Sequence, residues 1–147
     1  SFFSACVTTR TTPKSLGWRE SSLDWWATQA PKHELYISDE VVAELSNSNF
    51  LQSTEALEML SGLGVLIQTP DSLGFADILV GELVIPGPPT SGDALHLAVA
   101  TIHRMEYVLT WNVKHMDNQN KRVHFSTICM RFGLVPPQIV TPDLLED

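Results

Sequence analysis

Residues 91–111 read SGDALHLAVATIHRMEYVLTW, and this stretch decides the expected fold. Apolar side chains dominate after Asp93, which predicts a strongly apolar helix that starts at Thr90 or Ser91 and runs through Met105. The apolar run at 107–111 then predicts a strand. A buried helix that leads directly into a fully apolar strand is typical of a parallel sheet covered by helices.

The same alternation continues on both sides of this stretch. Further strands are predicted at 34–38, 64–68 and 138–141. Further helices are predicted at 21–30, from Ser38 or Asp39 onward, and at 54–61, 71–84 and 125–131. We therefore expect an α/β fold, with one parallel sheet between helices, in a single domain of residues 1–147. Ligands of such folds bind at the carboxyl ends of the strands.

Composition narrows the class of protein. A chain of 147 residues with 44% hydrophobic residues can bury a proper core, and it has no apolar run of the roughly 18 residues that a membrane span needs. Cys6 and Cys129 have neither metal-site spacing nor a disulfide pattern, which favours two buried free thiols in a cytoplasmic protein.

Charge is unevenly distributed along the chain. The formal net charge of −8 argues against nucleic-acid binding by simple attraction. Every charged residue from Glu34 to Asp93 is acidic, whereas the stretch from 104 to 131 is modestly basic. Its basic residues are Arg104, Lys114, Lys121, Arg122 and Arg131. Lys114, Lys121, Arg122 and Arg131 are candidates for guiding an RNA backbone, and a solvated helix face explains them equally well.

Three residues are expected at the sheet edge where a doubly wound fold binds ligands. Asp93 lies in the first turn of the apolar helix, where a capping box with Thr90 is an equally good explanation. Glu44 borders the apolar stripe of its helix, although a solvated glutamate is commoner. Asn112 directly follows the strand at 107–111, where loop asparagines are also frequent.

Glu44, Asp93 and Asn112 together suggest a metal site. Carboxylates gathered at one edge repel each other unless a cation joins them, and Mg²⁺ or Mn²⁺ prefers oxygen ligands. Such an ion binds a phosphodiester and lowers the pKa of an attacking water. His96 and His103 lie seven residues apart on one helix and are expected to be packed or hydrogen-bonded rather than zinc ligands.

Two motifs in the chain resemble the PIN-domain family, and most closely its bacterial VapC-like toxins. The first is DALHLAVA at 93–100, followed by MEYVLTWN at 105–112 and by His115. The second is SDEVVAEL at 38–45, which resembles the second acidic motif of the family. The spacing agrees over nearly the whole chain.

The resemblance implies a Rossmann-like α/β/α sandwich and an endoribonuclease that uses Mg²⁺ or Mn²⁺. It makes Glu44 and Asp93 metal-binding acids, and it puts Asn112 where many members have a fourth acid. It also implies positions near the site for Ser1, Thr110, His115 and Asn118. The implied partners are an RNA substrate and a cognate antitoxin, with a homodimer left open.

The chain departs from the family pattern in two places. Family members have a first strand that ends in an aspartate, and by the match of Ser1 this acid would stand two residues before Ser1. Without that strand the middle of the sheet is missing, and the remaining strands could hardly pair across the gap. The second departure is Asn112, a neutral ligand in place of an acid, which lowers the negative charge available to hold a metal.

Three functions follow as hypotheses. The first is cleavage of single-stranded RNA by the toxin of a toxin–antitoxin pair. The second is a PIN-like module that no longer cleaves and acts through protein contacts, which a neutral residue two positions before Ser1 would favour. The third is a nucleotide-binding domain, which needs a glycine-rich loop after a strand; the Gly62-x-Gly64 pair precedes one instead.

Overall fold

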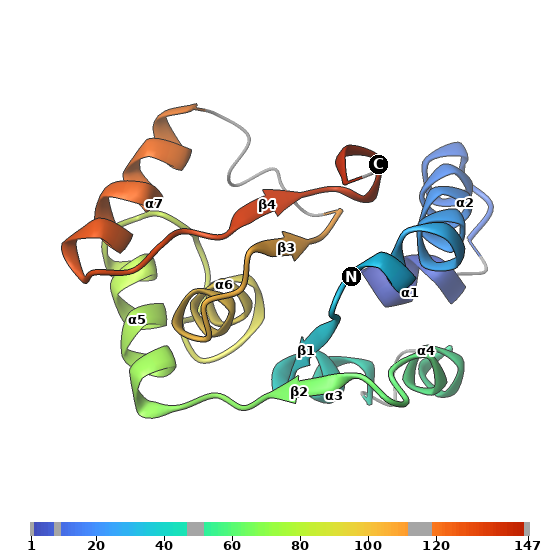
Figure 1. Ribbon diagram of the computed structural model, residues 1–147, viewed down its shortest axis with the longest axis horizontal. Helices are drawn as coiled ribbons and strands as arrows, with labels where there is room; N and C mark the ends of the chain where they lie inside the picture. The colour runs from blue at the N-terminus through green and yellow to red at the C-terminus, as the bar shows by residue number, and fades with distance from the viewer. Residues whose placement is uncertain (1, 8–9, 47–51, 112–118, 146–147) are drawn as a thin grey trace.

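A computed structural model of the protein describes residues 2–7, 10–46, 52–111 and 119–145. In this part of the chain, helices predominate and the strands are short (Figure 1). The helices are α1 (Phe2–Val7), α2 (Pro13–Thr28), α3 (Asp39–Leu45), α4 (Ser53–Met59), α5 (Pro70–Gly81), α6 (Gly92–Ile102) and α7 (Gln119–Arg131). The strands are β1 (Tyr36–Ser38), β2 (Gly64–Leu66), β3 (Tyr107–Leu109) and β4 (Gln138–Val140). Short 3-10 turns cover Ala30–Lys32 and Pro142–Leu144. The predicted mixed α/β class is confirmed.

The strands form two separate parallel pairs. Strand β1 pairs with β2, with Ile37 opposite Val65, and β3 pairs with β4, with Val108 opposite Ile139. Within the described residues no pairing joins β1 to β3. Figure 1 shows the two pairs pointing in opposite directions: β2 leads from α4 toward α5, whereas β4 leads from α7 back toward the C-terminus. The prediction of one parallel sheet with all carboxyl ends at one edge is therefore wrong for these strands.

A space between β1 and β3 explains the split. Neighbouring strands hydrogen-bond only when they lie about 4.7–4.9 Å apart, and a cavity of about 670 Å³ separates β1 from β3. The expectation that these strands could hardly pair across the middle of the sheet agrees with this split.

The helix boundaries depend on local capping. Ser38 caps α3 as predicted, since its hydroxyl accepts a hydrogen bond from the Val41 N–H at 3.2 Å. Helix α2 begins at Pro13 rather than at residue 21, because the Thr12 side chain caps it. Helix α6 has Ser91 at its N-cap without a side-chain capping bond, so the capping box of Thr90 with Asp93 is wrong.

The main core lies between α5, α6 and α7. Leu79, Leu95 and Ile128 are fully buried there, and the apolar helix at the centre of the sequence prediction, α6, packs closely on α5. Burying side chains of this size is the dominant favourable term in folding. The predicted apolar helix is confirmed, although it ends at Ile102 rather than at Met105.

Two smaller clusters complete the interior. One contains Phe2, Cys6, Trp25 and Ala30. The other contains Ile37, Leu45, Ala56 and Leu60. Cys6 and Cys129 are buried free thiols, as predicted.

Strand β2 corrects another expectation. The apolar run at 64–68 predicts a buried strand, but Val65 and Ile67 are 51% and 64% exposed. Strand β2 pairs on one side only, so its outer edge faces solvent. Among the described helices, none is long and apolar enough to span a membrane.

Candidate functional site

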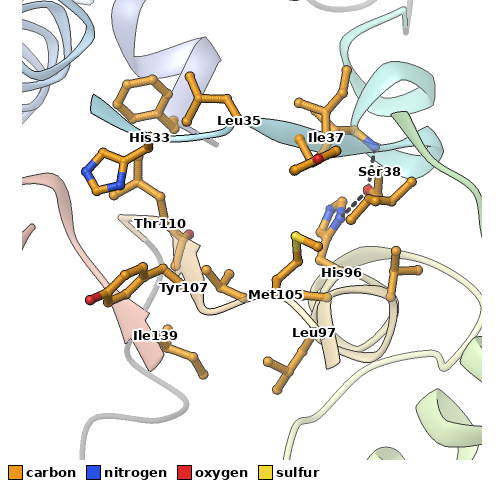
Figure 2. Close-up of a pocket in the computed structure, with 18 of the residues that line it drawn as sticks. His33, Leu35, Ile37, Ser38, His96, Leu97, Met105, Tyr107, Thr110 and Ile139 are labelled. Atoms are coloured by element: carbon orange, nitrogen blue, oxygen red, sulfur yellow. Dashed lines mark hydrogen bonds between the residues drawn. The ribbon is translucent and has the colours of Figure 1, made fainter. Parts of the chain in front are cut away.

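The candidate site lies where α3 meets α6. Glu44 comes from the last turn of α3, and Asp93 and His96 come from the first turns of α6. The imidazole of His96 joins the two helices: its Nε2 lies 3.1 Å from Glu44 Oε1, and its Nδ1 lies 3.2 Å from Ser38 Oγ. Figure 2 shows the bond between Ser38 and His96. The expectation that His96 is a hydrogen-bonded histidine is confirmed.

His96 forms one hydrogen bond with Ser38 and one with Glu44, and the chemistry of Glu44 fixes the direction of both. An ionised Glu44 only accepts, so Nε2–H of His96 donates to it. In neutral His96 the Nδ1 atom then accepts from the Ser38 hydroxyl, whose oxygen also accepts the capping bond from Val41. His96 therefore couples the start of α3 to its end.

The His96 hydrogen bond lowers the pKa of Glu44 below its ordinary value. Partial burial of the carboxylate opposes this effect, and the charge of His96 adds to it. The side chains are 22% exposed for His96 and 40% for Glu44, so water still screens the pair. Glu44 is thus an ionised oxygen donor near neutral pH.

The same residues face a cavity of about 670 Å³ between β1 and β3. Glu44, Asp93, Ser38 and His96 all line it, and so does Thr110. Figure 2 places Ser38 and His96 at one end of this cavity and Thr110 at the other. Two of the three predicted ligands, Glu44 and Asp93, therefore share one cavity, whereas Thr110 stands away from His96.

Several predicted site residues lie outside the described residues: Ser1, Asn112, Lys114, His115 and Asn118. The predicted convergence of Asn112 with Glu44 and Asp93 therefore stays a prediction.

A metal site is only partly present in the described chain. Glu44 and Asp93 offer the carboxylate oxygens that Mg²⁺ and Mn²⁺ prefer. Within residues 2–7, 10–46, 52–111 and 119–145, however, no three His, Cys, Asp or Glu side chains are grouped so that they could hold a metal ion. The donor chemistry fits a hard cation, and the number of described donors falls short of a complete site.

The basic residues of α7 have a structural role. Lys121 donates to the carbonyl oxygen of Leu83, and Arg131 pairs with Glu82 at 3.3 Å. His124 also bonds the carbonyl oxygen of Glu82. These contacts hold the turn after α5 against α7, a role that sequence reasoning missed. Arg122 is exposed on the same helix.

Sequence reasoning also missed Ser38 and Glu40 as members of the site. It assigned Ser38 to capping alone, and it did not consider Glu40, whose carboxylate accepts from the Gly92 N–H at 3.3 Å. Both residues stand at the carboxyl end of β1, in the stretch 38–45 that carries the acidic motif. The signal was therefore present in their position after a strand.

No family model, no curated protein and no solved structure matches the chain. The resemblance to PIN domains therefore depends on the motif residues alone.

Proposed function

We propose that the protein is a PIN-type endoribonuclease that cleaves single-stranded RNA with Mg²⁺ or Mn²⁺ and acts as the toxin of a toxin–antitoxin pair. The observation that carries this proposal is that Glu44 and Asp93, from the two motifs of the resemblance, line one cavity. The bond from Glu44 to His96, three residues after Asp93, ties the two helices together at that point.

The proposal includes the finer fold. A Rossmann-like sandwich has one parallel sheet, so the proposal requires the two strand pairs to run in the same direction and a further strand to lie between β1 and β3. The cavity between the two strand pairs leaves space for it.

Glu44 and Asp93 would hold the metal ion. Such an ion neutralises a phosphodiester and lowers the pKa of a bound water. His96 bonds one carboxylate oxygen of Glu44 and so fixes the orientation of that carboxylate, while the second oxygen can still bind a cation. Asn112 would add a neutral oxygen donor.

A second candidate function is a PIN-like module that binds proteins and does not cleave RNA. It is favoured by the absence of a three-residue metal group from the described residues and by the engagement of Glu44 with His96. A neutral residue two positions before Ser1 would favour it further.

Metal binding and cleavage test the proposal together. The protein, with any residues that precede Ser1 in its gene, is titrated with Mn²⁺ by electron paramagnetic resonance and assayed on fluorescent single-stranded RNA. We expect Glu44→Gln and Asp93→Asn each to remove most cleavage and to weaken Mn²⁺ binding at least tenfold. Glu55→Gln is the matched control, because Glu55 is an exposed glutamate on α4. Its cleavage should equal that of the unaltered protein.

Two results decide between the candidate functions. Protein that binds neither metal and cleaves no RNA contradicts the nuclease proposal and supports the protein-binding module. Cleavage that survives Asp93→Asn and Glu44→Gln contradicts the assignment of these residues.

A further inference from the structure

Two stacked indole rings lie outside the core, where α2 meets the end of β3. Trp18 of α2 and Trp111, two residues after β3, have ring centroids 5.2 Å apart and planes 11° apart. Both side chains are partly exposed, and neither belongs to the core clusters of the described residues. Trp25, on the same helix, is buried and packs in the cluster around Cys6. The Trp18–Trp111 stack is therefore a surface feature rather than part of the core.

A hydrogen bond fixes the orientation of the stack. The Trp111 Nε1–H donates to the Ser22 hydroxyl oxygen at 2.7 Å, and Ser22 is fully buried on α2. This bond satisfies the single polar atom of the Trp111 indole. A tryptophan has only two side-chain torsions, so a ring held in this way loses little further entropy when a ligand stacks on it. The two rings form a preorganised aromatic platform.

A cation lies beside this platform. Lys14 Nζ is 4.5 Å from the centre of the Trp18 ring, and Lys14 is exposed one turn earlier on α2. The stretch 10–32 has four basic residues and two acidic ones, a balance of +2, in a chain whose net charge is −8. Exposed charges are screened beyond about 8 Å at physiological salt, so a bound anion responds mainly to this local balance. The surroundings of the platform therefore suit an anion.

We propose that the Trp18–Trp111 stack binds an unpaired base of single-stranded RNA and that Lys14 contacts the phosphate next to that base. Aromatic side chains stack on any base, and basic side chains follow the backbone, in proteins that bind single strands without reading their sequence. The faces of a paired base are covered by its neighbours in the duplex, so the platform selects unpaired bases. The choice of RNA rests on the proposed function.

The platform is adjacent to the candidate site. Thr110, the residue before Trp111, lines the cavity that Glu44 and Asp93 also line. Figure 2 shows Thr110 at the end of this cavity away from His96. The platform is therefore a subsite for a different nucleotide from the one at the two carboxylates, and it binds without a metal ion.

Binding in the absence of metal tests the platform apart from cleavage. The protein is titrated in EDTA against a fluorescein-labelled oligouridylate of about eight nucleotides, within the site sizes of single-strand binders, and binding is followed by fluorescence anisotropy. The matched probe is the same strand with abasic riboses, which keeps every phosphate. We expect it to bind at least fivefold more weakly, because stacking of one base is worth roughly a factor of five to a hundred. The 2′-deoxy strand should bind within about twofold of the RNA, since stacking involves only the base.

Two substitutions at Trp18 separate stacking from packing. Trp18→Phe keeps an aromatic face and should bind nearly normally, whereas Trp18→Leu keeps only apolar bulk and should bind at least fivefold more weakly. Leu16→Ala, at an exposed position of α2, should leave binding unchanged. Circular dichroism checks that the variants fold, and the abasic strand decides if Trp18→Leu does not.

Lys14→Gln tests the phosphate contact. Losing one contact to a single strand should reduce the slope of the logarithm of the binding constant against the logarithm of the salt concentration by about 0.7. The affinities for the abasic strand and for oligouridylate should fall by the same factor, because both carry the phosphate. An unchanged slope would contradict the role of Lys14.

Three results overturn the platform: equal binding of the abasic strand, unchanged binding by Trp18→Leu, and loss of binding by the 2′-deoxy strand, which would assign the affinity to a ribose contact. The nuclease proposal is decided separately. Base-dependent binding by a protein that cleaves no RNA with Mg²⁺ or Mn²⁺ supports the platform and contradicts the nuclease. Cleavage with an unchanged KM in Trp18→Leu supports the nuclease and contradicts the platform.

Discussion

Two halves of the molecule differ in how many side chains they bury in their cores. The α5–α7 half comprises α5, α6, β3, α7 and β4, and the β1–β2 half comprises β1, α3, α4 and β2. Among the described residues, the core of the first contains thirteen buried side chains and the core of the second contains four. The first half therefore supplies most of the hydrophobic stabilisation.

The candidate site lies at the contact between these halves. Glu44 belongs to the β1–β2 half, and Asp93 and His96 belong to the α5–α7 half. Regions with few buried apolar contacts open at lower free energy than the main core. The geometry of the site therefore depends on how a weakly packed half is held against a strongly packed one.

The largest expected effect comes from the core of the α5–α7 half. Leu95 is fully buried on α6, and Leu95→Ala should lower the free energy of unfolding by about 4 kcal/mol, within the range of 2–5 for such changes. Leu45→Ala, in the smaller core of the β1–β2 half, should cost about 2 kcal/mol because its surroundings can relax. Urea denaturation measures both. Equal losses would remove the proposed difference between the halves.

The two cysteines extend the comparison to the small cluster around Cys6, which lies outside both halves. Burial raises the pKa of Cys6 to about 12, against a smaller lowering by its bond to Ser22, and raises that of Cys129 to about 11. Both thiols should therefore be inert in the folded protein. In dilute urea we expect Cys6 to react with a disulfide reagent roughly tenfold faster than Cys129, because the small cluster around Cys6 opens first.

Single-cysteine variants, Cys6→Ser and Cys129→Ser, assign the two reaction rates. Cys6 is expected to react faster although its pKa in the folded protein is the higher of the two. The reason is that the thiols react in opened states, in which both pKa values return to the ordinary value of a cysteine. Equal rates would mean that the small cluster and the main core open as one unit.

A third test probes the β1–β2 pair. A Cβ added at Gly64 would lie 2.6 Å from Cδ1 of the Tyr36 ring on the paired strand. Gly64→Ala should lower the free energy of unfolding by about 1–2 kcal/mol, because the ring must move. The same change in a Tyr36→Ala background should cost less than half as much. An equal cost in both backgrounds would assign the loss to the backbone of β2 instead.

The sequence predicted the local elements better than the way they assemble. The apolar helix α6, the cap at Ser38 and the glycine stops at Gly62 and Gly133, whose φ angles are positive, follow from residues close in sequence. The pairing of the strands does not follow from residues close in sequence, because it depends on what lies between β1 and β3. The assumption of one sheet therefore failed at the cavity between β1 and β3.

The site shows the same division. Glu44 and Asp93 were identified from their motifs, and the structure brings them to one cavity. The link through His96 was not predicted, because it joins residues 52 positions apart. Lys121 and Arg131 contact the turn at Glu82 and Leu83, which sequence spacing on α7 alone does not show, and the expected role of the basic set in guiding RNA stays a prediction.

The smallest expected effect concerns the bond between the halves, from Glu44 to His96. The pKa of Glu44 is lower in the folded protein than its ordinary 4.5, so the unfolded chain binds a proton more tightly at this group. Its contribution to stability is therefore complete above about pH 4.5 and is lost as the pH falls through the lower folded value. Because the carboxylate is 40% exposed, the contribution is at most about 1 kcal/mol, as for other solvated pairs.

Glu44→Gln should therefore reduce stability slightly at pH 6 and should flatten the fall in stability below pH 4.5, measured by urea denaturation from pH 6 to pH 3. Glu58→Gln, an exposed glutamate on α4, is the control for losing one carboxylate, and it should keep the slope of the unaltered protein. His96→Leu should give the same flattened slope as Glu44→Gln, since leucine has no N–H to donate to the carboxylate. An unchanged slope in both site variants would show that this bond does not hold the two halves together. Another contact would then have to hold them. The next one to remove is the hydrogen bond that the Gly92 N–H donates to Glu40.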